Sequence, residues 1–435
     1  DKVEVTLKDV NIDTSSRNKA AVSVTGEGDT NIKLDGDNAL KSDIYRSGIY
    51  GSGSGSLTIS GGENDSLTAQ GGSGANGISS SGSLTISGGT VTANGDDGGR
   101  GISSSGSVTI SGGSTVTANG GSGTISGGDG ICSSGGVTIS GGSTVTANGG
   151  NGGSLVGGDG IRSGGGLTVS DGTVTAKGGN GDSKDGYGGD GIRSGGVVTI
   201  SGNTVNASGG YGGKVGGYGI CSFDRVAISG GTVEAAGGNG STGGGSGIYS
   251  SVIDLSGSLE LTAKAGSPTG KALLQNGREL DLDTIKDKLG PGAKVTATDA
   301  NGETKQVSIP RPVEPEEPVI PEESSSSSDG GSATPSAPVS PLPGLTVTDR
   351  DGQRISYTST QSGNTLTVCV GRFTASFRIS LAALRQLRAE GIETITFQTI
   401  LCSTTLSVDE LLAMGGEDAE AVLTHRFTDS SLTVG

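Results

Sequence analysis

The stretch GICSSGGVTISGGSTVTANGG, residues 130–150, contains the unit from which most of this 435-residue chain is built. A Gly-Ile pair opens the unit, two segments of alternating apolar and polar residues follow, and a glycine-rich loop closes it. A period of this length is typical of solenoids, propellers and repeat arrays. The pair recurs at spacings of 24 to 31 residues, with its glycine at Gly48, Gly77, Gly101, Gly130, Gly160, Gly191, Gly219 and Gly247.

Within each unit the apolar residues recur at a period of two, which predicts short strands with one buried face. Three such strands cannot bury their apolar faces alone, but successive units can share one interior when they wind into stacked coils. A propeller would need longer strands and aromatic motifs. We therefore predict an all-β fold, a right-handed parallel β-helix with three strands per coil and about eight to ten coils. The unit at 130–150 places on the buried face Ile131, Val137, Ile139, Val145 and Ala147.

The glycine-rich loops differ in length from one unit to the next. We expect them to leave the coil at one corner, where a longer loop costs little free energy. Gly-Gly and Asn-Gly steps, as at Asn94, Asn119 and Asn148, are expected to supply the positive φ angles of tight corners.

The composition excludes several classes of protein. With 87 Gly, 5 Phe and no Trp, the chain cannot build a conventional aromatic-rich core, and the lack of a Gly-X-Y period excludes collagen. The net charge of −16 argues against a nucleic-acid partner. No segment is long and apolar enough to span a membrane. The chain starts at Asp1 without a visible signal peptide, and we expect that an export signal has been removed.

Three parts are predicted along the chain. Residues 1–309 contain the repeats, with added coils before residue 47, a short helix at 280–289 and a hairpin turning at Asn301-Gly302. Residues 310–343 hold nine of the eleven prolines and five consecutive serines, the composition of an extended linker. Residues 344–435 regain long aliphatic and aromatic side chains, which predicts a small α+β domain. Its expected strands lie at 345–348, 366–370 and 392–397, and its expected helices are capped by Ser380 and Ser407.

Several motifs in residues 1–265 resemble the clostridial carbohydrate-binding β-helix family. They are VTLKDVNI at 5–12, AAVSV at 20–24, NIKLDGDNAL at 31–40, SGIY at 47–50 with GSLTISG at 55–61, and GIRS at 160–163 and 191–194. The better-known family members are extracellular proteins associated with acidic, pectin-like polysaccharides and calcium. The resemblance implies a secreted or cell-surface protein of Gram-positive type that binds glycans.

The residue before each Gly-Ile pair should form a column along the rod, because stacked coils repeat about every 4.8 Å. Three successive coils place Asp129, Asp159 and Asp190 in this column, which we call the Asp column. Stacked carboxylates repel one another unless a cation or a base lies between them, and calcium accepts carboxylate and carbonyl oxygens as ligands. One interpretation is therefore a calcium site. The other, which we favour, is that Asp simply suits these turns.

The residue after each Gly-Ile pair forms a second column, in which Arg162 and Arg193 are neighbours, whereas Arg100 stands in the first column. Paired guanidinium groups suit the carboxylates of an acidic sugar, so these three arginines are the predicted ligand-binding residues. The alternative interpretation, which the sequence favours, is a solvated face or local pairing with the aspartates.

The four cysteines and the single histidine carry little functional signal. Cys132 and Cys221 should lie about 14 Å apart, three coils along the rod, which is too far for a disulfide. Cys369 and Cys402 fall on predicted strands of the small domain and are candidates for one. His425 is predicted to be structural.

Thr-Val-Thr recurs at 90–92, 115–117, 144–146 and 173–175, so two ladders of hydroxyl groups are expected to point outward, as in ice-binding β-helices. The pattern breaks at Asn206 and Glu234, and Thr is a common strand residue. Ice binding is therefore only a minor alternative.

The expected function is non-enzymatic. Glycoside hydrolases need carboxyl groups that converge on one sugar bond, whereas the three aspartates run along the rod axis. We expect a monomeric glycan-binding or adhesion protein whose partner is an acidic polysaccharide or another host or cell-surface ligand. One alternative is a structural spacer or an adhesin that binds proteins. The other is a polysaccharide lyase that uses an arginine beside the Asp column as its base.

Overall fold

The structure is a computed structural model that describes residues 2–310, 342, 344–349, 352–372, 374–400, 402–416, 419–425 and 430–434. The chain divides into two compact units, Asp1–Glu317 and Pro318–Gly435. The division falls within the segment 310–343 that the sequence predicts to be a linker. Almost all of that segment lies outside the described residues, so the linker stays a prediction.

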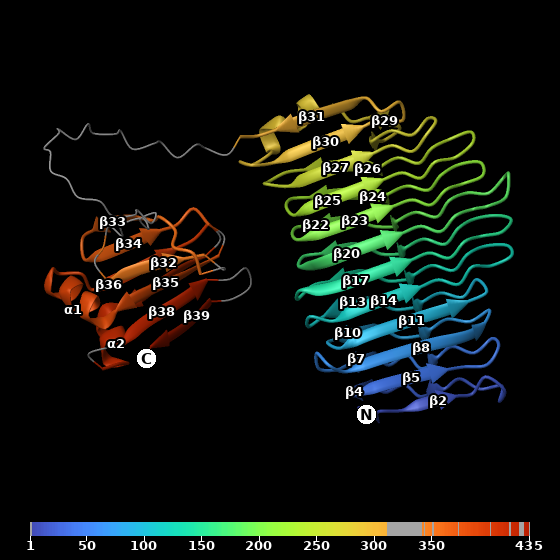
Figure 1. Cartoon of the computed structure of the whole chain (residues 1–435), viewed down its shortest axis with the longest axis horizontal. Coiled ribbons are helices and arrows are strands. Elements are labelled where there is room, and N and C mark those ends of the chain that lie inside the picture. The colour runs from blue at the N-terminus through green and yellow to red at the C-terminus, as the bar shows by residue number, and fades with distance from the viewer. Residues whose placement is uncertain are drawn as a thin grey trace, which may run out of the picture. The chain divides into compact units, whose positions relative to one another are not determined.

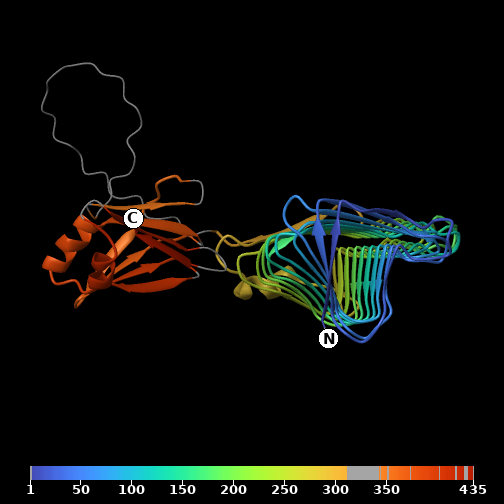
Figure 2. The same cartoon turned by 90° about the horizontal axis from the view of Figure 1, so that it is seen from below.

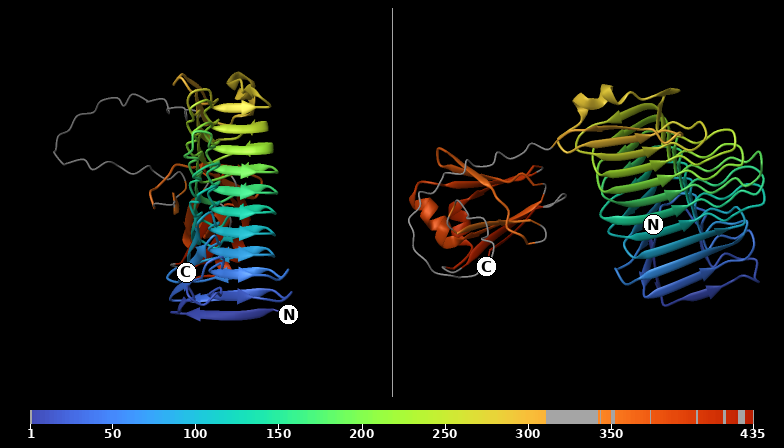
Figure 3. Two further views of the ribbon diagram at one scale, coloured as in Figure 1. Left: turned by 90° about the vertical axis from the view of Figure 1, so that its right-hand side faces the viewer. Right: turned by 45° about the horizontal axis from the view of Figure 1, so that its top comes forward.

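The first unit is a parallel β-helix in which each coil contributes three strands (Figure 1). The solenoid has about 13 turns, more than the eight to ten coils expected, because the N-terminal segment and the C-terminal cap extend the stack. Figure 3 shows the strands of successive coils lying one above the other. The predicted fold class is confirmed.

The three strands of a coil belong to three ladders of parallel strands. We call them the short-strand, middle-strand and long-strand ladders. The short-strand ladder contains β3 (Val22–Val24), β6 (Ile49–Gly51), β9 (Ile78–Ser80), β12 (Ile102–Ser104), β15 (Ile131–Ser133), β18 (Ile161–Ser163), β21 (Ile192–Ser194), the first parts of β24 (Ile220–Ile228) and β26 (Ile248–Leu255), and β28 (Leu273–Gln275). The middle-strand ladder contains β1 (Val3–Lys8), β4 (Thr30–Asp35), β7 (Leu57–Ser60), β10 (Leu84–Ser87), β13 (Val108–Ser111), β16 (Val137–Ile139), β19 (Leu167–Val169), β22 (Val198–Ile200) and the second parts of β24 and β26.

The long-strand ladder forms a sheet of its own and contains β2 (Asn11–Asp13), β5 (Asp37–Lys41), β8 (Ser66–Ser73), β11 (Thr90–Asp96), β14 (Thr115–Asn119), β17 (Ser143–Asn148), β20 (Gly172–Lys177), β23 (Thr204–Ser208), β25 (Thr232–Ala236), β27 (Glu260–Lys264) and β30 (Lys294–Thr298).

The interior is a set of aliphatic columns in register. Ile131 lies beside Ile161 and Ile161 beside Ile192, and all three are fully buried. Between residues 2 and 310 the core contains no aromatic side chain among those described. Each buried Ile, Val or Leu contributes about 1.5–3 kcal/mol of transfer free energy, so many small columns replace a few large aromatic contacts.

The two ends of the coil stack differ. At the C-terminal end, β30 pairs with β31 (Thr304–Ser308) in an antiparallel hairpin that turns at Gly302, whose φ is +87°. A 3₁₀ helix, η1 (Leu282–Lys288), and the short strand β29 (Arg278–Glu279) complete this cap. The predicted hairpin is confirmed, and the predicted helix is a 3₁₀ helix. At the other end, Val3 and Val5 continue core columns but are 50% and 43% exposed.

The sequence suggested positive φ angles at both Gly-Gly and Asn-Gly steps, but the Asn-Gly steps lack them. The Gly-Gly corners between the middle and long strands have them, as at Gly141 (φ +63°) and Gly142 (φ +70°). The glycines that follow Asn94, Asn119 and Asn148 do not. That part of the prediction is wrong, because the chain runs straight from each long strand into its loop without turning.

The glycine-rich loops are stacked in register on one another, which the sequence did not predict. Figure 2, which looks along the coil stack, shows them projecting from one corner. Parallel bridges join each loop to the next, and they connect Gly123 to Gly152, Gly152 to Gly181, and Gly181 to Gly212. We call the set of loops at residues 120–128, 149–158, 178–189, 209–217 and 237–245 the loop stack.

Backbone hydrogen bonds form the main framework of the loop stack, and side-chain bonds such as that from the Asn180 N–H to Asn151 Oδ1 at 2.9 Å add to it. The Gly150 N–H donates to the Gly128 oxygen of the preceding loop at 2.8 Å, and the Gly158 N–H donates to Gly150 of its own loop at 2.8 Å. The same zigzag continues through Gly179 and Gly189. A Cβ added to Gly158 would overlap the Gly128 carbonyl, so only glycine permits this spacing.

The second unit is a small α+β fold of two four-stranded sheets, visible with its labels in Figure 1. One sheet is antiparallel; the other pairs β34 with β36 in parallel. The first sheet contains β32 (Leu345–Thr348), β35 (Ala375–Ser380), β38 (Glu420–His425) and β39 (Ser430–Val434). The second contains β33 (Thr358–Ser362), β34 (Thr365–Cys369), β36 (Thr394–Gln398) and β37 (Ser403–Ser407).

Both predicted helix caps of the second unit are present. Helix α1 (Leu381–Ala389) begins after Ser380, whose Oγ accepts the Ala383 N–H at 3.2 Å. Helix α2 (Val408–Ala413) begins after Ser407, whose Oγ accepts the Glu410 N–H at 3.4 Å. Each N-cap satisfies a backbone donor that the first helical turn leaves unpaired.

His425 and the cysteines of the second unit have structural surroundings. His425 is fully buried against Phe377, and its Nε2 lies 2.9 Å from Thr404 Oγ1. Burial lowers the pKa of this imidazole, which favours its neutral form. Cys369 and Cys402 are free thiols, so the candidate disulfide is absent from the structure.

Candidate functional site

The Asp column lies where the loop stack meets the short-strand ladder. Asp129, Asp159 and Asp190 are only 6%, 6% and 4% exposed. The Asp129 Oδ1 accepts the Asp159 N–H at 2.9 Å, and the Asp159 Oδ1 accepts the Asp190 N–H at 2.8 Å. The Asp190 Oδ1 accepts the Tyr218 N–H at 2.7 Å. Each carboxylate therefore joins its own coil to the next.

Two of the three carboxylates also have an arginine partner. Arg100 Nε lies 3.2 Å from Asp129, and Arg193 Nη1 lies 3.4 Å from Asp190. Burial and the flanking Asp190 and Asp129 carboxylates raise the pKa of Asp159 to about 8. Burial also raises the pKa of Asp190, to about 6, because the Tyr218 N–H and Arg193 offset part of the effect. The raised pKa favours the neutral form of Asp159, which relieves repulsion within the column.

The column offers few oxygen atoms to a metal ion, because its carboxylates accept backbone N–H groups and pair with arginine. Across the described parts of the chain, no group of three or more His, Cys, Asp or Glu side chains is arranged to hold a metal ion. Calcium prefers six to eight oxygen ligands. The contacts give the three aspartates a structural role, and calcium stays a prediction for experiment.

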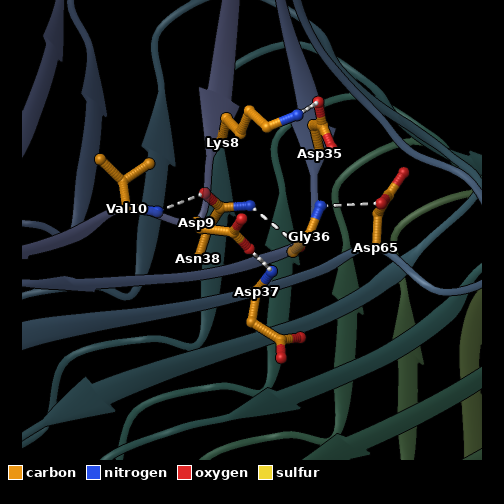
Figure 4. Close-up of polar contacts among 8 residues, drawn as sticks. All are labelled: Lys8, Asp9, Val10, Asp35, Gly36, Asp37, Asn38 and Asp65. Carbon is orange, nitrogen blue, oxygen red and sulfur yellow. Dashed lines mark hydrogen bonds and ion pairs between the residues drawn. The ribbon is translucent and has the colours of Figure 1, made fainter.

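The same device recurs at an acidic corner near the N-terminus (Figure 4). The Asp9 Oδ1 accepts the Asp37 N–H at 3.1 Å, and the Asp65 Oδ1 accepts the Gly36 N–H at 2.9 Å. Asn38, which is 3% exposed, accepts the Val10 N–H at 3.0 Å. Corner side chains that accept a backbone N–H from a neighbouring coil are thus a general feature of this solenoid.

The structure brings two of the three predicted arginines together. Arg162 and Arg193 are paired neighbours on β18 and β21. The Arg162 side chain is exposed and forms no ion pair or side-chain hydrogen bond with any described residue. The Arg193 side chain is 39% exposed and lies over the Phe223 ring, 5.2 Å from its centroid. Arg100 lies apart from this pair, on an earlier coil beside Asp129.

Three aromatic side chains that the sequence did not single out as site residues lie on the two coils that follow the coil of Arg193. The rings of Tyr218 and Tyr249 are stacked at 5.0 Å with an interplanar angle of 14°. Phe223 is 55% exposed. Tyr218 stands in the Asp column and Tyr249 in the arginine column, so an aromatic substitution within the repeat columns was the available signal. We call Arg162, Arg193, Tyr218, Phe223 and Tyr249 the Arg–aromatic patch.

The two cysteines of the arginine column are structural. Cys221 lies between Arg193 and Tyr249 in the ladder and is 1% exposed. Burial raises the pKa of the Cys221 thiol to about 12 and that of Cys132 to about 11. Both stay protonated at neutral pH, which makes them poor nucleophiles. Both are free thiols, in accordance with their predicted separation.

The threonine ladders lie on the long-strand sheet. Thr144 and Thr146 pair with Thr173 and Thr175 in register. The column of Thr146 is interrupted at Asn206 and Glu234, whereas the column of Thr144 continues through Thr204 and Thr232. The asparagines two residues after Thr117 and Thr146 form an amide ladder, in which Asn148 Nδ2 donates to Asn119 Oδ1 at 2.8 Å. This face is uncharged over several coils and carries no aromatic side chain.

The fold and the patch together define a parallel β-helix repeat protein with a second, small α+β unit. No family model, no curated protein and no solved structure matches the chain. None of the described helices has the length and apolar character needed to cross a membrane.

Proposed function

We propose that this protein is an extracellular, non-catalytic carbohydrate-binding protein that binds acidic polysaccharide at the Arg–aromatic patch. The observation that carries the proposal is a cluster of three aromatic rings, one exposed and two half-buried, on the coils that follow the neighbouring arginines Arg162 and Arg193. Three of the seven aromatic residues of the first unit lie in this one patch. The resemblance of residues 1–265 to a carbohydrate-binding β-helix family supports the same function.

The chemistry of the patch suits an acidic sugar. A guanidinium group can bind a carboxylate through two parallel hydrogen bonds, and the exposed Arg162 side chain forms no ion pair or side-chain hydrogen bond with a described residue. Aromatic rings offer a flat apolar surface to the C–H face of a sugar ring. The neutral form of Asp159 at pH 7 leaves more of the arginine charge available to a ligand.

Binding without catalysis is supported by the positions of the carboxyl groups. A glycosidase needs two carboxyl groups on either side of a sugar bond. Asp224, next to Phe223 on β24, is exposed and supplies one carboxyl group. The three aspartates of the Asp column are at most 6% exposed and accept or bridge backbone N–H groups of adjacent coils. They are therefore poorly placed to reach a bound chain.

The test is calorimetric titration of the full chain with polygalacturonate, with calcium and again with EDTA, alongside an assay for unsaturated products. We expect heat of binding and no products; loss of binding in EDTA would show that calcium takes part. Unsaturated products would instead identify a polysaccharide lyase. Absence of heat under both conditions would favour the spacer or adhesin alternative.

A matched set of variants locates the site. We expect Arg162→Gln with Arg193→Gln to weaken binding by at least about tenfold, because charge-assisted hydrogen bonds each contribute about 1.5–3 kcal/mol. Arg278→Gln, on the exposed strand β29 of the C-terminal cap, is the control and should bind like the wild type. Equal affinity of the double variant and the control would exclude the patch.

A further inference from the structure

The loop stack has a three-residue pattern that fixes where its side chains point. In the outgoing arm of one loop, an added Cβ on Gly149 would overlap the Gly158 carbonyl of the return arm. An added Cβ on Gly150 would overlap the Gly121 carbonyl of the preceding loop. The third residue, Asn151, is exposed. Glycine therefore fills the two inward directions, and the third position faces solvent along the edge of the stack, where the Asn151 Oδ1 accepts the Asn180 N–H of the next loop at 2.9 Å.

The return arm follows the same rule on the opposite surface. A Cβ on Gly157 would overlap the Gly179 carbonyl, and one on Gly158 would overlap the Gly128 carbonyl. The third position of this arm carries Val156, which is 39% exposed. Outgoing and return arms thus present their side chains on opposite surfaces of the loop stack.

Corresponding side chains of the return arms form a ladder. Parallel bridges join Val156 to Tyr187 and Tyr187 to Val215, so these residues lie on three successive loops. Tyr187 is 45% exposed, and Lys214 Nζ lies 5.7 Å from its ring centroid. We call Val156, Tyr187 and Val215 the loop ladder.

The loop ladder leads directly to the Arg–aromatic patch. Three residues beyond each of its members comes a residue of the Asp column, Asp159, Asp190 or Tyr218, and the short strand follows. The Tyr218 ring, carried by a return arm, stacks on Tyr249 of the short-strand ladder. An apolar ladder and an arginine pair thus flank the same buried column.

We propose that the loop ladder is the second wall of the glycan-binding surface and that the ligand is an internal stretch of a linear acidic polysaccharide lying along the coil stack. This inference rests on the proposed function. A sugar chain has apolar C–H faces and polar edges, so it can contact both walls at once. From the coil of Val156 to that of Tyr249 the surface spans about 14 Å, three steps of about 4.8 Å.

The test compares wild-type protein with two loop variants in titrations with polygalacturonate and with galacturonate oligomers of increasing length. The first variant is Val156→Ser with Tyr187→Ser. The second is Tyr211→Ser, the matched control, because Tyr211 is 47% exposed at the third position of an outgoing arm, on the opposite surface. All the substitutions are at exposed positions, and circular dichroism would verify the fold.

We expect the first variant to bind the polymer and the longer oligomers about threefold to tenfold more weakly, the range for loss of an aromatic contact and a small apolar one. Tyr211→Ser should match the wild type, and wild-type affinity should rise with oligomer length up to the span of the surface. A dimer that binds as tightly as the polymer would overturn the inference.

The outcomes separate this inference from the proposed function. If the loop variants bind like the wild type while Arg162→Gln with Arg193→Gln loses affinity, the patch binds glycan and the loop ladder takes no part. If the wild type binds neither polymer nor oligomer, both proposals are wrong.

Discussion

The strand body and the loop stack of the first unit repeat with the same coil but are held together in opposite ways. In the body, large aliphatic side chains such as Ile131 and Ile161 fill the space between strands. In the loop stack, glycine removes the side chains, and carbonyl oxygens approach Cα atoms of the next arm. One region is stabilised by burial of apolar surface and the other by backbone hydrogen bonds at close range.

The comparison shows how one chain can keep a constant coil-to-coil spacing in its interior while the exposed residues of its loops vary. Buried columns need side chains of the right volume in every coil. The loop stack needs glycine at two positions in three, whereas the third position carries Val or Tyr in the return arms and Tyr or a bridging Asn in the outgoing arms. The loops are therefore the part of the coil where exposed chemistry can vary without disturbing the interior.

Shortening a buried side chain of the strand body should lower the free energy of unfolding more than any other change considered. Ile161→Ala is expected to lower the free energy of unfolding by about 2–5 kcal/mol, because it leaves a cavity between fully buried neighbours. Chemical denaturation followed by circular dichroism would measure it. Thr144→Ala, on the exposed face of β17, should change stability by less than about 0.5 kcal/mol. A small effect of Ile161→Ala would mean that adjacent coils collapse around the gap.

Replacing a loop-stack glycine by alanine should lower the stability of the protein where the new methyl group would meet a carbonyl oxygen. Gly158→Ala is expected to destabilise the protein by about 1–3 kcal/mol, because the backbone must shift and hydrogen bonds in the zigzag are lost. Gly243→Ala is the matched change in the same loop stack, since its Cβ would meet Val215 at an ordinary 3.5 Å. Equal stabilities of the two variants would show that the loops contribute little to folding.

The Asp column, between the two regions, should give a pH-dependent effect. The folded-state pKa of Asp159, about 8, lies above the value of about 3.9 for an unfolded Asp, so folding takes up a proton between these pH values. The stability from Asp159 is fully present below pH 4 and is lost as the pH rises toward 8. Asp159→Asn keeps an Oδ1 acceptor for the Asp190 N–H but cannot ionise.

Asp159→Asn should therefore lose less stability than the wild type as the pH rises from 5 to 8. At pH 8 we expect Asp159→Asn to be more stable by at least about 1 kcal/mol, since one pKa unit corresponds to about 1.4 kcal/mol. Denaturation at several pH values would measure the difference. Asp182→Asn, at an exposed position in the loop stack, is the control. Parallel pH profiles for wild type and Asp159→Asn would mean that Asp159 does not hold the proton.

In the second unit, local signals predicted some elements and missed others. The caps at Ser380 and Ser407 were found because an N-cap depends on residues within one helical turn. Strand β38 was not predicted, although its core residues Ala421 and Leu423 alternate; it lies between β35, some forty residues earlier, and β39.

The coil, its three strands and the columns follow from the sequence alone, because alternation is a local property and the repeat shows which residues become neighbours. The same repeat puts Arg162 beside Arg193 and the three aspartates in one line. The role of the loop glycines and the contacts between aromatic rings become visible only in the folded chain. A glycine has no side chain to show a buried face, so the loop stack depends on carbonyl groups from other coils. Tyr218 and Tyr249 likewise come into contact only because one loop and the next coil's short strand meet at the same corner.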